Sequence, residues 1–171
     1  LTGKTAYAVT SIADVFISEL KAALTLGNKE ITVSSQTDTK IDIMSFNIWT
    51  TKPDDARVER VISAMTQYMP DIIGLQEASP YWMTVLKNGM PSDYAFIGEG
   101  RDGGNKGEYN PVFYLKNKYK LIESGTRWLS ATPNVPSKFS ESSLNRIFTY
   151  AIFETKKDGT KFMFINTHLE H

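Results

Sequence analysis

The spacing of apolar and polar residues predicts a β-α-β-α order in the first part of the main domain. Residues 41–48 alternate with the period of two that is typical of a strand. Residues 54–69 place apolar side chains at helical intervals after two aspartates, which favours a helix that Pro70 ends. The apolar run 71–77 predicts a short buried strand, and residues 79–89 predict a second helix with proline in its first turn.

Strand-like segments dominate the remainder of the chain. The glycine-rich stretch 98–107 predicts a loop between two strand-like segments, and Asp158-Gly159 predicts a hairpin turn between the last two strands. The predicted strands after this loop are 112–115, 121–129, 147–154 and 161–168. These elements indicate the α/β class, shading into α+β in the antiparallel second half.

The first 40 residues differ from the rest in pattern and carry no recognisable chemistry. Residues 10–26 have helical spacing of apolar positions, and Gly27-Asn28 is a stop signal for that helix. Residues 34–40 are small, polar and without a period, as in a linker. We therefore expect residues 1–40 to be an N-terminal extension or the tail of a preceding module, and residues 41–171 to form the domain of interest.

Composition and charge exclude few classes of protein. The 171 residues are 41% hydrophobic, which is enough for one domain with its own core. Nineteen basic and nineteen acidic residues cancel, so no global electrostatic footprint for nucleic acid or an anionic membrane is present, although a local basic patch is still possible. The absence of cysteine excludes disulfides and thiolate chemistry. No apolar run reaches the ~20 residues of a membrane span.

Because the chain starts at Leu1 rather than at methionine, we expect a piece of a longer protein.

Both histidines lie in the segment 166–171, which an apolar run, residues 162–165, delivers to the end of a strand. Asn47 and Glu77 end two strands of the predicted β-α-β unit, so we expect them at the same sheet edge. A carboxylate and an amide oxygen there suit Mg²⁺, which takes one or two carboxylates and keeps several waters. Taken singly, Glu77 is equally compatible with a solvated strand-end acid or a helix cap, and Asn47 with a turn or a satisfied buried amide.

Four segments follow one another in a characteristic order: Ser45–Ile48, Asp71–Glu77, Gly107–Tyr114 and Asn166–His171. Together they resemble the endonuclease/exonuclease/phosphatase superfamily of metal-dependent phosphoesterases, which are related to deoxyribonuclease I. The stretch Thr126–Pro133 also looks like a segment of secreted bacterial members, so the resemblance favours a secreted or periplasmic location. It implies a truncated first half of a four-layer α/β/β/α sandwich of the deoxyribonuclease I type.

The resemblance also implies residue roles. Asn47 would orient the phosphate or a catalytic side chain, and Glu77 would be the ligand of Mg²⁺, for which Mn²⁺ or Ca²⁺ are possible substitutes. His168 looks like the histidine that hydrogen-bonds the phosphate as negative charge develops in the transition state. His171 would point to the opposite face of a strand and contribute indirectly at most.

Five further positions receive expectations of different kinds. Tyr109 and Asn110 sit where similar enzymes present a polar residue to the phosphate. Arg146 and Asn166 are candidate phosphate contacts, and a surface salt bridge is an equally good interpretation of Arg146. For Glu108 we favour a structural role.

Other interpretations of these motifs are weaker. Residues 167–171 superficially resemble the zinc motif of metallo-β-lactamase-like hydrolases, but Glu170 stands where that motif has its second histidine, and no distant histidine exists. The loop 98–107 lacks the Gly-Lys-Ser/Thr ending of a phosphate-binding P-loop. The three tryptophans, Trp49, Trp82 and Trp128, are expected in the core or at its rim rather than as stacking platforms for bases.

The resemblance leads us to expect two further family motifs, an Asp-x-Asn segment and an Asp-His pair, which this sequence does not contain. We therefore expect a metal-dependent phosphodiesterase or phosphomonoesterase as the parent protein, with these 171 residues inactive alone. The alternative is a non-catalytic binding module with the same fold. The phosphoester substrate is left open among nucleic acid, nucleotides, phospholipid head groups and sugar phosphates.

Overall fold

The computed structural model describes residues 40–169. The helix expected at residues 10–26 and nearly all of the expected linker lie outside this range, as does His171. Within it the elements are, in order, β1 (Ile43–Asn47), α2 (Asp55–Gln67), β2 (Ile72–Gln76), α3 (Pro80–Gly89), β3 (Tyr94–Ile97), β4 (Val112–Leu115), β5 (Tyr119–Trp128), β6 (Ile147–Thr155) and β7 (Lys161–Thr167).

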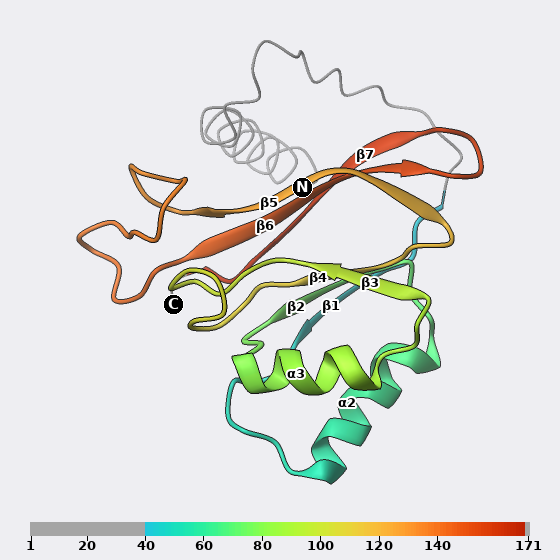
Figure 1. The fold of residues 1–171 in the computed structure, drawn as a ribbon, viewed down its shortest axis with the longest axis horizontal. Coiled ribbons are helices and arrows are strands. Elements are labelled where there is room, and N and C mark those ends of the chain that lie inside the picture. Colours follow the sequence, from blue (N-terminus) through green and yellow to red (C-terminus); the bar gives the residue numbers. More distant parts are fainter. Residues whose placement is uncertain (1–39, 170–171) are drawn as a thin grey trace, which may run out of the picture. The chain divides into compact units, whose positions relative to one another are not determined.

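Two sheets lie face to face, and both helices cover the outer face of the first sheet (Figure 1). The first sheet has the strand order β1-β2-β4-β3, in which β1 and β2 are parallel and the other pairs antiparallel. The second sheet is an antiparallel meander in the order β5-β6-β7. The described residues therefore form three layers, one of helices and two of strands, and the expected mixed α/β class with two sheets is confirmed.

Alternation along the central strands separates two hydrophobic cores. On β2, Ile73 and Leu75 pack with the helices, whereas Ile72 belongs to the cluster between the sheets. The helix-side cluster includes Val61, Met65, Trp82, Met83, Leu86, Phe113 and Leu115, and the inter-sheet cluster comprises Ile72, Val112, Tyr114, Tyr119, Ala151 and Phe153. This two-sided burial explains why β2 appears in the sequence as a continuous apolar run.

The helices begin and end within two residues of their predicted bounds, because local signals set their ends. The Asp54 carboxylate caps α2 by accepting from the Arg57 amide at 2.7 Å, and Ser79 caps α3 by accepting from the Trp82 amide at 3.4 Å. Pro80 occupies the first turn of α3, where its missing N–H costs nothing. No helix among residues 40–169 is long and apolar enough to span a membrane.

Candidate functional site

Three strand ends bring Asn47, Glu77 and His168 together. Parallel pairing of β1 with β2 sets Asn47 opposite Gln76, so Glu77 follows immediately beyond that register position. Asn47 Nδ2 donates to Glu77 Oε1 at 2.8 Å, and His168 Nε2 lies 4.0 Å from the same oxygen. His168 directly follows β7 of the other sheet, so the cluster spans both sheets. The expectation that Asn47 and Glu77 share a sheet edge is confirmed.

The Glu77 carboxylate is held ionised at the edge of β2. The hydrogen bond from Asn47 is the main cause that lowers the pKa of Glu77. Burial opposes this effect, while the Thr50 amide, the neighbouring His168 and the positive charge of Arg101 act in the same direction as Asn47. The Thr50 amide donates to Oε2 at 3.1 Å. The backbone of Glu77 has φ 59°, in the left-handed region that non-glycine residues rarely occupy. Strained backbone and a partly exposed carboxylate together favour a binding role over a structural one.

Asn47 orients Glu77 through a local turn. Its Oδ1 accepts from the Trp49 amide at 2.9 Å, which directs the amide NH₂ toward the Glu77 carboxylate. Trp49 has φ 58°, and its carbonyl accepts from Trp82 Nε1 at 2.9 Å and from Arg57 Nη2 at 3.0 Å. The turn after β1 is thus fixed from the helix layer, and it holds Asn47 against the Glu77 carboxylate.

The three tryptophans divide as the sequence indicated. Trp82 is fully buried in the helix-side core and Trp128 is 4% exposed, whereas Trp49 lies at the rim with 61% of its surface exposed. The Trp128 indole N–H donates to the Arg101 carbonyl at 2.6 Å. This bond ties the glycine-rich loop to β5.

Asn166 joins the two sheets. Its Nδ2 donates to the carbonyls of Leu75 at 2.6 Å and Pro111 at 3.0 Å, and its Oδ1 accepts from Gln76 Nε2 at 2.7 Å. The side chain fills the space over Gly74, where a Cβ would come within 2.8 Å of Asn166 Oδ1. Because Asn166 is buried and both amide protons are used, we assign it to the link between the sheets instead of to the phosphate contact expected from the sequence.

Tyr109 and Asn110 occupy different environments. Tyr109 lies in the helix-side core and its hydroxyl donates to Asn105 in the glycine-rich loop at 2.9 Å. Burial, reinforced by the negative charge of Glu99, raises the pKa of the Tyr109 phenol, which favours its neutral form. Asn110 is also buried, and its Nδ2 donates to the Ile147 carbonyl at 2.9 Å. Only Asn110 of this pair lines the pocket beside His168.

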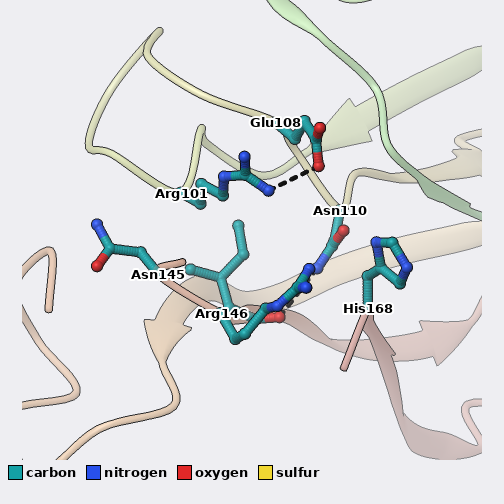
Figure 2. Close-up of a pocket in the computed structure, with 7 residues that line it drawn as sticks. Arg101, Glu108, Asn110, Asn145, Arg146 and His168 are labelled. Carbon is teal, nitrogen blue, oxygen red and sulfur yellow. Dashed lines mark hydrogen bonds and ion pairs between the residues drawn. The ribbon is translucent and has the colours of Figure 1, made fainter. Parts of the chain in front are cut away.

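A small polar pocket adjoins the cluster (Figure 2). Three chain segments line it, and the lining residues are Arg101, Glu108, Asn110, Asn145, Arg146, Ile147 and His168. Arg146, expected from the sequence as a phosphate contact, is 6% exposed and reaches this pocket from the start of β6. Arg101 Nη1 donates to Glu108 Oε2 at 2.7 Å, which gives Glu108 the structural partner that we favoured.

Sequence reasoning missed Arg101 and Asn145. Arg101 lies in the loop that the sequence marked only by its glycines, and Asn145 precedes Arg146 at the end of a long connection. The available signal for Arg101 was an arginine within a glycine-rich loop that ends in Glu108. The signal for Asn145 was its place directly before a candidate phosphate contact.

The donor set fits a hard divalent ion that keeps most of its waters. Within the part of the chain that the structure describes, no group of three or more His, Cys, Asp and Glu side chains could hold a metal. The single carboxylate of Glu77 is ionised, 21% exposed, and supported by Asn47 and Thr50. One carboxylate plus water is a mode of binding that Mg²⁺ uses and that zinc does not.

Comparison with known proteins gives the family. Residues 44–158 match the Endonuclease/Exonuclease/phosphatase family. A solved member of that family from Bacteroides vulgatus is 36% identical with a TM-score of 0.72, over 77% of this chain and 53% of that one. The mannosyl-6-phosphatase of Bacteroides thetaiotaomicron is 33% identical with a TM-score of 0.71, over 77% of this chain and 52% of that one. No curated protein matches this chain.

The chain belongs to the Endonuclease/Exonuclease/phosphatase family, as the four sequence segments indicated. It spans about half the length of the solved relatives that it matches. The described residues have the phosphoesterase fold of this family.

Proposed function

We propose that the protein containing this chain is a Mg²⁺-dependent phosphoester hydrolase in which Glu77 is a metal ligand. The observation that carries the proposal is the cluster of Asn47, Glu77 and His168 beside a pocket with two arginines. A metal-binding carboxylate next to cationic donors is the arrangement that phosphoryl transfer requires. The similarity to a mannosyl-6-phosphatase supports the same class of reaction, with sugar phosphates among the candidate substrates.

Each side chain has a distinct task in this proposal. Glu77 offers its ionised carboxylate to Mg²⁺, and Asn47 keeps that carboxylate turned toward the ion. His168 donates a hydrogen bond to a phosphate oxygen as charge accumulates on it, at the edge of the pocket that Arg146 lines. Bound Mg²⁺ would polarise the phosphoryl group and neutralise its charge.

The first test measures divalent-ion binding by the loss of the electron paramagnetic resonance signal of free Mn²⁺. We expect Glu77→Gln to weaken Mn²⁺ binding by more than about tenfold and Asn47→Ala by about tenfold, because both the ligand and its orienting partner are altered. The matched control is Glu59→Gln, which removes an exposed carboxylate from α2 and should leave binding unchanged. Mn²⁺ binding that is indifferent to Glu77→Gln would contradict the assignment of the metal ligand.

The second measurement is hydrolysis of p-nitrophenyl phosphate and bis(p-nitrophenyl) phosphate with Mg²⁺, by this chain and by a version of the length of its relatives. We expect Glu77-dependent turnover from the longer version and little from the 171 residues alone. A longer version that binds Mn²⁺ and phosphate but turns over neither ester would instead support the alternative of a non-catalytic binding module. Robust turnover by this chain alone would refute the expected dependence on additional residues.

A further inference from the structure

We propose that Arg101, held by Glu108, recognises a terminal phosphate in the pocket of Figure 2, so that the site selects phosphomonoesters over phosphodiesters. This inference rests on the proposed function, because it names the substrate class of the same centre. Arg101 lies 45 positions before Arg146 and 67 positions before His168 in the sequence, yet all three line one pocket.

The glycine-rich loop is built so that it places Arg101. The Arg101 amide donates to the Glu108 carbonyl at 2.9 Å, and the Arg101 carbonyl accepts from Trp128 Nε1. Gly107 has φ 74°, and a Cβ there would come within 2.9 Å of Arg101 Cγ. Two hydrogen bonds therefore fix the Arg101 backbone, and the glycine at position 107 leaves the space that the start of the Arg101 side chain occupies.

A second contact holds this loop against the segment that carries Arg146. Asn145 Nδ2 donates to Asp102 Oδ1 at 3.0 Å, so the residue after Arg101 is bonded to the residue before Arg146. The Arg101 and Glu108 side chains are only 16% and 19% exposed. Two arginines from different loops are thus held at one small pocket before any ligand arrives, which lowers the entropy cost of binding an anion.

The charges of the pocket favour a dianion. Arg101 and Arg146 contribute two positive charges and Glu108 one negative charge, which leaves a net positive charge among the lining side chains apart from His168. Glu108 accepts from Nη1, one of the five N–H donors of the Arg101 guanidinium, and so orients the planar fork that matches phosphate oxygens. A terminal phosphate carries a charge of about −1.5 to −2 and three non-bridging oxygens. A diester has one charge and a second substituent, which this small pocket would have to accommodate.

The test compares binding of methyl phosphate and dimethyl phosphate, a monoester and a diester of nearly equal size. Isothermal titration without metal at about pH 8, where the monoester is a dianion, separates anion recognition from hydrolysis. We expect the full chain to bind methyl phosphate at least about tenfold more tightly than dimethyl phosphate. We expect Arg101→Gln to remove most of that preference and Arg101→Lys to restore part of it, because lysine keeps the charge but loses the fork.

The control is Arg60→Gln, which removes an exposed arginine on α2 and should leave the preference intact. Circular dichroism confirms that each variant is folded. Equal affinity for the two esters, an unchanged preference in folded Arg101→Gln, or no measurable binding of either ester would each overturn the inference. Such a result would leave the proposed hydrolase standing if Mn²⁺ binding still depends on Glu77, so the two failures are distinguishable.

Discussion

Two carboxylates flank the same strand, and their surroundings differ. Asp71 directly precedes β2 and Glu77 directly follows it. Both have a lowered pKa and both accept several hydrogen bonds. They differ in burial, in the cation that faces them and in backbone strain, and these differences underlie the structural role of Asp71 and the metal-binding role that we propose for Glu77.

Asp71 is 3% exposed and closes the end of the molecule away from the candidate site. Its Oδ1 accepts from Lys118 Nζ at 2.5 Å, and its Oδ2 accepts from the Tyr119 hydroxyl at 2.9 Å and from the Asp42 amide at 3.1 Å. These partners come from both sheets, so the carboxylate ties β1, β2 and β5 together. With its partners supplied by the protein, little of Asp71 is left to bind a ligand.

The Glu77 carboxylate has fewer hydrogen-bond partners than that of Asp71, and the backbone of Glu77 adopts a strained left-handed conformation. The donors to its carboxylate are an amide side chain and a backbone N–H, while the nearest cationic candidate, His168, is 4.0 Å away. No lysine or arginine forms an ion pair with Glu77 among residues 40–169. Because Glu77 lacks a permanent cation, it is the carboxylate that we propose for the divalent ion.

The largest predicted effect is on stability at the Asp71 end. Asp71→Asn should lower the free energy of unfolding by about 2 kcal/mol, because it breaks a hydrogen-bonded ion pair whose carboxylate is buried, although the Lys118 side chain is half exposed, and it removes an acceptor from the buried donors around it. Urea unfolding measures the change, and Asp93→Asn at an exposed site is the control. If Glu77→Gln destabilises the chain as much as Asp71→Asn does, the two carboxylates do not differ as described.

A smaller effect should appear in the pH dependence of stability. Burial alone would raise the pKa of Asp71, but hydrogen bonds from Lys118, the Asp42 amide and Tyr119 outweigh it and lower the pKa from its ordinary value of 3.8. The stabilisation is therefore fully present above pH 3.8 and is lost as the pH falls through the lowered, folded-state pKa.

Unfolding free energies of the wild type and Asp71→Asn, measured from neutral pH downward, isolate this contribution. Their difference should stay constant above the ordinary pKa of the carboxyl and shrink below it. A difference that grows as the solution is acidified would mean that the pKa of Asp71 is raised in the folded protein.

The smallest predicted effect concerns the backbone at Glu77. At φ 59°, Glu77→Gly should be more stable than Glu77→Ala by about 1 kcal/mol, since alanine is disfavoured in the left-handed region. At the exposed helical Glu59, the order should reverse, with glycine less stable than alanine by about 1 kcal/mol. The same order at both positions would show that no backbone strain is stored at Glu77.

Much of the fold follows from local pattern in the sequence. Both helices and the later strands were predicted to within about two residues, because caps, proline and apolar spacing act over short distances. The meeting of Asn47 and Glu77 was also predictable, since parallel strands with a crossover helix end at one sheet edge. Residue type and strand direction were sufficient to predict that these two side chains meet.

The remainder depends on contacts between distant segments. Asn166 was expected at the phosphate, but it donates to the carbonyl of Leu75 in the facing sheet, 91 positions away, and to that of Pro111, which directly precedes β4 and is 55 positions away. The position of Arg101 depends on a loop shaped by Gly107 and on the Trp128 indole. No periodicity encodes such contacts, because they arise only when the two sheets pack.

The close approach of Gly74 and Asn166 fixes the positions of the two chain segments that lead into the candidate site. Glu77 comes three positions after Gly74, and His168 comes two positions after Asn166. Since each added residue turns a strand's side chains to the opposite face, a one-residue insertion in either interval would separate the carboxylate from the imidazole while leaving the anchor itself intact. The lengths of these two intervals therefore determine the distance between the carboxylate and the imidazole, just as the residues at their ends determine the chemistry.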